Sequence, residues 1–226
     1  AVHYYWLAGL FGGVPLKLDE TQAIDEPPMG RATAVETWAQ VTKDLGEAAA
    51  ATPASWPASE FGRATRGAAL TLLGKAYLQS AAMVPELAGN RQRALETFRQ
   101  VLGLGYQLDP NYASLFDGTN EQSREIIWSL QNIRVNNNGG TLTQWFSPVT
   151  SPAIFAPSQQ NQFQAERPFY DGYHPSDVRK AATWQTTLPV PGRTVTWEWR
   201  SGIQAASQYG STGPVPRKYV DYAAPA

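Results

Sequence analysis

The sequence predicts a mainly α protein, in which a scaffold of amphipathic helices is followed by a long loop-rich region with short strands. Apolar residues recur at three- and four-residue steps through residues 31–51, 65–83 and 90–104, as they do on the buried face of a helix. Residues 132–215 show no such period, and Asn, Gln, Gly, Pro, Ser and Thr dominate them. Loops this long in a compact domain usually carry function or lie against a scaffold, so we expect ligand contacts there.

The composition argues against several classes of function. The 18 Lys+Arg and 19 Asp+Glu residues leave a formal charge of −1 without a basic run, which disfavours a nucleic-acid partner. The chain has no cysteine, and this excludes disulfides, thiolate catalysis and cysteine-based metal sites. Charged residues make up only 16% of the chain, whereas Pro, Gly, Trp and Tyr are frequent. That balance favours long ordered loops over disorder.

The first helical segment covers the start of the chain and ends at a glycine-rich break. Residues 1–8 have no initiator Met, no basic n-region and no cleavage site, so they do not form a signal peptide. They are interpreted as the last turns of a helix whose beginning precedes Ala1. The run FGGVPL at residues 11–16 cannot continue this helix.

The second helical segment is predicted to begin at a capping box. Thr33 and Glu36 are spaced so that the hydroxyl and the carboxylate cover free amides of the first turn. The helix is expected to continue to about residue 51. Its apolar stripe consists of Val35, Trp38, Thr42, Leu45 and Ala49.

The third and fourth helical segments together match a tetratricopeptide unit. LGKAY at residues 73–77 fits the L-G-x2-Y core of that unit, and ALETF at residues 94–98 fits its later A-x3-F. An ordinary αα-hairpin is the alternative. In either case the two helices pack antiparallel. The residues expected at their buried faces are Ala69, Leu72, Leu73, Gly74, Ala76 and Tyr77 on the third segment, and Ala94, Leu95, Phe98, Val101 and Leu102 on the fourth.

Two further local signals complete the predicted organisation. Asn90 is a good N-cap for the fourth segment, and the β-rich residues 125–131 are predicted to form a short strand. We therefore expect one domain in two parts: a helical scaffold over residues 1–131 and a loop-rich ligand-binding part over residues 132–226.

Residues 136–200 combine aromatic rings with amides, as sugar binding requires. Flat rings cover the C–H faces of a sugar, and amide or charged groups bind its hydroxyls. Trp145 is the preferred candidate because polar residues and glycines precede it, whereas Trp197 and Trp199 would share one face of a strand. The alternative is that these aromatics fill a core where regular structure is sparse. The candidate ligand-binding residues are Gln144, Trp145, Phe146, Trp184, Trp197 and Trp199.

Catalytic and metal-binding signals are weak. The spacing of Glu166, Asp171 and Glu198 does not favour the facing acids of a glycosidase. His3 and His174 stand alone, without the motif of a metal hydrolase or a serine hydrolase. No catalytic residue, metal or cofactor is therefore predicted.

Five blocks of sequence, taken in order, match the pattern of a known family. They are an aromatic helix end running into FGGVPL (residues 4–16), GRATRGAA with the helix after it (62–78), residues 106–128, a D-x-R turn (177–179) and RKYVD (217–221). The D-x-R turn is interpreted as a structural ion pair. In this order the blocks resemble the SusD/RagB family. Because both ends of that family's pattern are absent, the chain is interpreted as an interior fragment.

The resemblance implies a binding protein rather than an enzyme, built on a tetratricopeptide-like scaffold. Such a protein is an outward-facing lipoprotein of the bacterial outer membrane. Its signal and lipidated cysteine would precede Ala1, and the membrane would be contacted only through that lipid anchor. The resemblance further implies that the protein captures an oligosaccharide, or in some members a peptide, and delivers it to a TonB-dependent SusC-like transporter.

Two other classes of function remain open at the level of sequence. The helices would form a protein-interaction scaffold without a glycan site if the aromatic loops are merely packed. A cleft with two facing acids of raised pKa would instead indicate a carbohydrate-active enzyme.

Overall fold

The computed structural model describes residues 1–21, 27–116, 120–131, 165–190, 193–196, 199 and 213–217. The chain forms two compact units: unit 1 (Ala1–Leu108 and Arg124–Leu130) and unit 2 (Asp109–Ser123 and Gln131–Ala226). The expected division at residue 131 stays a prediction, and Asp109–Ser123 groups with unit 2. Within the described ranges, no helix has both the length and the apolar character needed to span a membrane.

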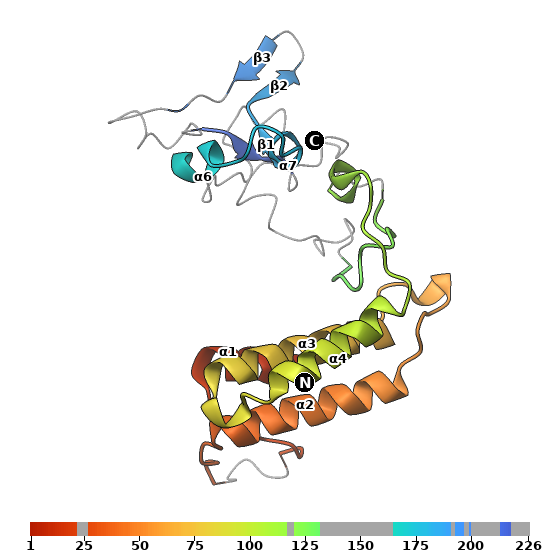
Figure 1. The fold of residues 1–226 in the computed structure, drawn as a ribbon, viewed down its shortest axis with the longest axis vertical. Coiled ribbons are helices and arrows are strands. Elements are labelled where there is room, and N and C mark those ends of the chain that lie inside the picture. The colour runs from red at the N-terminus through yellow and green to blue at the C-terminus, as the bar shows by residue number, and fades with distance from the viewer. Residues whose placement is uncertain are drawn as a thin grey trace. The chain divides into compact units, whose positions relative to one another are not determined.

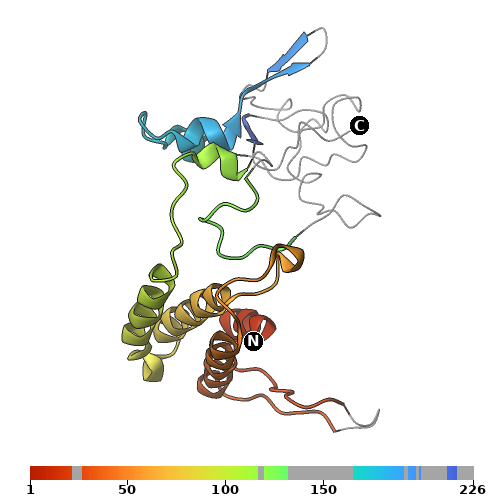
Figure 2. The same cartoon turned by 90° about the vertical axis from the view of Figure 1, so that its right-hand side faces the viewer.

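Unit 1 contains the helices that the sequence predicts. They are α1 (Val2–Phe11), α2 (Ala34–Ala51), α3 (Arg66–Met83) and α4 (Asn90–Leu102). Helix α3 packs against α2 on one side and α4 on the other, as Figures 1 and 2 show. The mainly α fold class is thereby confirmed.

The main core of unit 1 forms where α1, α2 and α3 meet. Trp38 and Val41 of α2 are almost fully buried and pack in one cluster with Leu73 of α3 and Ala8 of α1. The predicted stripe on α2 was partly wrong, because Val35 is 37% exposed. Burying a large apolar side chain such as that of Trp38 supplies the main driving force for this packing.

A buried hydroxyl explains why the inner face of α2 differs from the predicted stripe. The side chain of Thr37 is fully buried, although it is polar. Its Oγ1 donates to the Thr33 carbonyl at 2.9 Å and accepts from the Val14 amide at 3.3 Å. A buried polar group is tolerated when it is hydrogen-bonded, so this face of α2 can turn inward.

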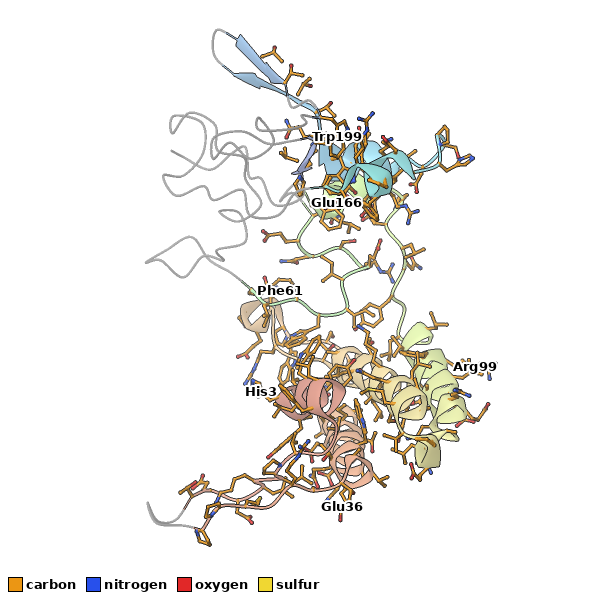
Figure 3. All side chains as sticks on the ribbon, turned by 90° about the vertical axis from the view of Figure 1, so that its left-hand side faces the viewer. His3, Glu36, Phe61, Arg99, Glu166 and Trp199 are labelled. Carbon is orange, nitrogen blue, oxygen red and sulfur yellow. The ribbon has the colours of Figure 1, made fainter. Side chains whose placement is uncertain are left out.

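The capping box at the start of α2 is confirmed. The Thr33 hydroxyl accepts the Glu36 amide at 3.2 Å, and the Glu36 carboxylate accepts the Thr33 amide at 2.8 Å. These hydrogen bonds from Thr33 favour the charged form and lower the pKa of the Glu36 carboxyl. Figure 3 labels Glu36 in this first turn.

Helices α3 and α4 meet through the expected small residue. A Cβ added at Gly74 would lie 2.5 Å from the Phe98 ring, so glycine permits this close approach. Ala94 of α4 is buried, as predicted. The Arg93 guanidinium lies over the Tyr77 ring, with 5.9 Å between its central carbon and the ring centroid.

Three predictions for α4 were wrong. Leu95 and Leu102 are 45% and 75% exposed, and Thr97 is buried in their place. Asn90 is the first residue of the helix rather than its N-cap, which is Gly89. The side chain of Asn90 is buried, and its Nδ2 donates to Ser80 Oγ of α3 at 3.0 Å. It therefore ties the two helices together instead of capping one of them.

The strand predicted over residues 125–131 does not form. The segment is irregular and lies against the helices of unit 1. Ile127 packs on a second apolar cluster that includes Leu70 and Val101, and Trp128 Nε1 donates to the Gly62 carbonyl at 3.1 Å. Side-chain packing therefore holds these β-prone residues without a partner strand.

In the described residues of unit 2, the regular elements are short. Its short helices are α6 (Arg167–Asp171) and α7 (Arg179–Thr183), with a 3₁₀ turn at Tyr112–Leu115. Two antiparallel pairs are present: β1 (Trp184–Gln185) with β4 (Val215–Pro216), and β2 (Thr187–Val190) with β3 (Arg193–Thr196).

Candidate ligand-binding site

A hollow of about 730 Å³ lies in unit 2 beside α7 and the β1–β4 pair. This is within the usual range for small-molecule sites. Aromatic, amide, hydroxyl and charged side chains line it together. The lining residues are Tyr170, Pro175, Ser176, Asp177, Val178, Lys180, Ala181, Trp184, Gln185, Thr186, Thr187 and Arg217.

The β1–β4 ladder and the turn before α7 position this lining. Trp184 pairs with Pro216 and Gln185 with Val215, so a distant segment of the chain is held beside Trp184. Val215 is almost completely buried and anchors the pair. Arg217 follows β4 directly and thus reaches the same hollow.

An ion pair stabilises the turn that leads into α7. Arg179 Nε donates to Asp177 Oδ1 at 2.8 Å, and the Arg179 amide donates to the same oxygen at 3.0 Å. The Arg179 guanidinium holds the pKa of the Asp177 carboxyl at about 2, below its ordinary value. The interpretation of this D-x-R turn as a structural ion pair is confirmed.

Aromatic rings are grouped around Trp184. The centroid of its ring lies 6.4 Å from that of Tyr170 and 6.3 Å from that of Phe169, both in edge-to-face geometry. Tyr170 also contacts Trp199, with centroids 5.9 Å apart. Such pairs stabilise one another beyond the burial of their area. The hollow therefore has a fixed aromatic wall made by Tyr170 and Trp184.

Two polar atoms of the lining residues are buried without a hydrogen-bond partner in the described part of the chain. They are the donor Nε1 of Trp184 and the acceptor Oε1 of Gln185. Leaving such atoms unpaired costs about 1–3 kcal/mol each. A ligand that carries adjacent hydroxyl groups can satisfy both, because a hydroxyl both donates and accepts.

The structure describes only two of the six predicted ligand-binding residues. Trp184 lines the hollow. Trp199 is half-buried against Tyr170 and lies next to Gly213, at whose Cα an added Cβ would be 2.6 Å from the Trp199 ring. Figure 3 labels Trp199 beside the short elements of unit 2. The other four, Gln144, Trp145, Phe146 and Trp197, lie outside the described residues.

Sequence reasoning did not single out the remaining charged and aromatic lining residues as ligand contacts. Tyr170, Lys180 and Arg217 come from separate segments. A local signal was available for Lys180, which follows the D-x-R turn, and for Arg217, which begins the RKYVD block. Their convergence depends on the β1–β4 pairing, which the sequence spacing does not reveal.

The described residues contain no arrangement typical of catalysis. Asp171 is paired with Arg167 at 3.3 Å, and Glu166 does not line the hollow. The only carboxylate among the described lining residues, that of Asp177, is engaged by Arg179. Among the described residues, no group of three His, Cys, Asp or Glu side chains is placed to hold a metal ion.

Comparison with known proteins agrees with this architecture. A family of SusD-like proteins, described as "Starch-binding associating with outer membrane", matches residues 1–78. The starch-binding protein SusD of Bacteroides thetaiotaomicron is 29% identical over 147 residues, which cover 62% of this chain and 25% of SusD. A SusD-like protein of Formosa agariphila is 27% identical over 146 residues, covering 63% of this chain and 26% of that protein.

Solved structures resemble the chain over almost its whole length. A SusD-like protein from Bacteroides fragilis superposes with a TM-score of 0.77 at 20% identity, covering 98% of this chain and 49% of that one. A laminarin-binding SusD-like protein gives a TM-score of 0.75 at 22% identity, covering 97% and 49%. The chain is thus similar to SusD-like proteins in sequence over residues 1–78 and in fold over almost its whole length.

The chain spans only part of the length of the proteins that it resembles. The chain spans about a quarter of the length of the two relatives matched by sequence. It spans about half the length of the two solved structures. The tetratricopeptide-like scaffold expected from LGKAY and ALETF is confirmed by this fold.

Proposed function

We propose that this chain is part of a surface protein that binds nutrient oligosaccharides and delivers them to a TonB-dependent SusC-like transporter. The hollow beside Trp184 in unit 2 is the proposed glycan site. Nothing in this role requires a cofactor.

The observation that carries the proposal is the combination of a fixed aromatic wall with unpaired polar atoms. Tyr170 and Trp184 line the hollow, and two atoms of its lining residues, Trp184 Nε1 and Gln185 Oε1, are buried without a hydrogen-bond partner in the described part of the chain. Sugars present apolar C–H faces beside hydroxyl groups, so one pyranose can stack on a ring and satisfy both atoms.

The relatives support binding rather than catalysis. Their names describe a starch-binding protein, a laminarin-binding protein and a glycan-binding protein in complex with laminarihexaose. The Asp177 carboxylate at the hollow is paired with Arg179, which lowers its pKa. A general acid needs a raised pKa instead. These observations favour a protein that binds sugar without cleaving it.

The proposed location is the outer face of the outer membrane, where a lipid anchor would hold the full-length protein. The matched family is described as associating with the outer membrane. Helix α1 carries apolar side chains that are well exposed in this chain, including Trp6, Leu10 and Phe11. Exposed apolar surface of this kind is typical of protein contacts, and a protein-interaction role for unit 1 is compatible with transfer to a transporter.

A glycan array followed by calorimetric titration of the full-length protein tests the proposal. Trp184→Ala is expected to weaken the best glycan by about thirtyfold, since truncating a binding aromatic costs about 2 kcal/mol. Trp184→Phe keeps a ring but removes the Nε1 donor, so it should lose about fivefold, or roughly 1 kcal/mol.

Trp6→Ala is the matched control, because Trp6 is exposed on α1 and lies in unit 1. It should leave the affinity unchanged. A Trp184→Ala protein with normal affinity and a large loss of stability would place Trp184 in the core and refute the site. Absence of binding across the array would refute the function.

Trp145 remains a separate candidate for the same role. Trp145→Ala is expected to weaken glycan binding while leaving the melting temperature nearly unchanged. A buried Trp would instead cost about 3–5 kcal/mol of stability. The same two measurements, glycan affinity and melting temperature, test alanine variants of the other candidates, Gln144, Phe146, Trp197 and Trp199.

A further inference from the structure

The charges that line the hollow are unequal. Among its described lining residues, only Asp177, Lys180 and Arg217 carry a formal charge. Two are cationic and one is anionic. The sign of the field inside the hollow therefore depends on whether Asp177 neutralises one of the two cations.

Asp177 is already paired with Arg179, a residue that is not among those lining the hollow. Its carboxylate accepts Arg179 Nε at 2.8 Å and 3.1 Å and a terminal guanidinium nitrogen at 2.5 Å. Both carboxylate oxygens are thus occupied by one guanidinium, in a bidentate pair that is stronger than a single contact. The Asp177–Arg179 pair is neutral as a unit. The positive charges of Lys180 and Arg217 therefore remain uncompensated among the described lining residues.

Lys180 is held at the hollow by an aromatic ring instead of an acid. Its Nζ lies 4.1 Å from the centroid of the Tyr170 ring. A cation–π contact orients the ammonium but does not cancel its charge. In the described part of the chain, the Lys180 side chain has no ion pair with a carboxylate.

Arg217 reaches the hollow from the opposite segment. It follows β4, which the ladder holds beside Trp184 and Gln185. Within the described residues its guanidinium also lacks a carboxylate partner. The hollow therefore presents an ammonium and a guanidinium next to the stacking ring, an arrangement suited to an anion carried on a sugar.

We propose that the hollow prefers an acidic oligosaccharide, whose carboxylate or sulfate group is bound by Lys180 and Arg217 while its ring stacks on Trp184. This inference rests on the proposed glycan-binding function and adds the class of ligand. A neutral glucan offers hydroxyls to Trp184 Nε1 and Gln185 Oε1 but leaves the two cations unused.

Matched charged and uncharged probes test the preference in the full-length protein. A galacturonic acid tetrasaccharide is compared with its methyl ester, and a sulfated galactan tetrasaccharide with the desulfated form. At low salt, the acidic member of at least one pair should bind about tenfold more tightly, as a charge-assisted hydrogen bond provides. The carboxylate and sulfate arms identify which anion is bound. The difference should shrink in about 1 M salt, where the Debye length is near 3 Å.

Substitutions at the two cations connect the preference to the hollow. Lys180→Gln with Arg217→Gln should reduce the ratio of acidic to neutral affinity to near one, whereas Lys180→Arg should retain the ratio. Lys75→Gln removes the same charge from an exposed position of α3 in unit 1 and should leave the ratio unchanged. Thermal melts of each variant exclude misfolding as the cause.

Three results would overturn the inference. Equal or tighter binding of the uncharged member in both pairs, with neutral glycans bound elsewhere on the array, would refute the acidic preference and leave the proposed function standing. An acidic preference that survives the double substitution would place the anion site away from Lys180 and Arg217. Absence of binding to every glycan would remove the proposed function and this inference together.

Discussion

Replacing Gly13 by alanine should destabilise unit 1, because this glycine has backbone immediately against it. A Cβ at Gly13 would lie 2.1 Å from the Ala32 carbonyl oxygen and 2.9 Å from the Thr33 carbonyl carbon. Ordinary contact requires more than 3 Å, so the two segments must separate by about 1 Å. Backbone cannot rotate away as a flexible side chain does.

The hydrogen bonds on either side of Gly13 set the size of the effect. The Ala32 amide donates to the Val14 carbonyl at 3.1 Å, and the Val14 amide donates to the buried Thr37 Oγ1 at 3.3 Å. Arg31 Nε donates to the Gly13 carbonyl at 2.9 Å. Weakening two or three such bonds at about 1 kcal/mol each should lower the unfolding free energy by about 2–3 kcal/mol.

Gly46→Ala is the matched control with the opposite sign. Gly46 lies inside α2, and an added Cβ there meets nothing within 4 Å. Alanine should therefore stabilise the helix by about 0.5–1 kcal/mol. Equilibrium urea unfolding followed by circular dichroism measures both variants. A Gly13→Ala protein within about 0.5 kcal/mol of the parent would refute the steric reasoning.

Three further predictions follow from local contacts. Gly74→Leu should cost about 1–3 kcal/mol by overpacking against Phe98, and unchanged urea unfolding would contradict the packing of α3 on α4. Thr33→Ala should speed amide exchange in the first turn of α2 through loss of the cap, whereas unaltered exchange would show that the cap is dispensable. The depressed pKa of Asp177 means that its ion pair stabilises the fold above about pH 4 and that this contribution is lost as the pH falls through about 2. Carboxyl NMR should show that pKa rising toward 3.8 in Arg179→Gln; an unmoved titration would disprove the coupling.

The local sequence predicted the structure correctly where contacts between residues close in the sequence determine it. The capping box of Thr33 and Glu36 joins residues three apart, and it forms as predicted. The repeat-like spacing placed α3 and α4 correctly, since a glycine and an aromatic ring at those positions allow close helix packing.

The local sequence did not predict the structure correctly where contacts with residues distant in the sequence determine it. Asn90 has the character of an N-cap, but its amide finds Ser80 on the neighbouring helix. Residues 125–131 have strand propensity but form no strand, because Ile127 packs against the helical core of unit 1. Propensity is weaker than such tertiary contacts.

The same distinction applies to the candidate site. Residue type and a place after the D-x-R turn make Trp184 a candidate at the level of sequence, and its ligand role stays a prediction. The pairing of β1 with β4 brings Arg217 to the hollow that Trp184 and Lys180 also line. No periodicity in the sequence encodes that pairing.

The most direct measurement is the NMR signal of the tryptophan indole groups during glycan titration. Trp184 Nε1 and Trp38 Nε1 are both buried without a partner in the described structure, but Trp184 lines the hollow and Trp38 lies in the helical core. Assignment uses the loss of one cross-peak in Trp184→Phe. If the hollow binds glycan, the Trp184 indole proton should shift downfield in a saturable manner as it gains a hydrogen bond, while Trp38 stays in place. Saturable glycan binding that leaves the Trp184 signal unmoved would contradict the assignment of the site.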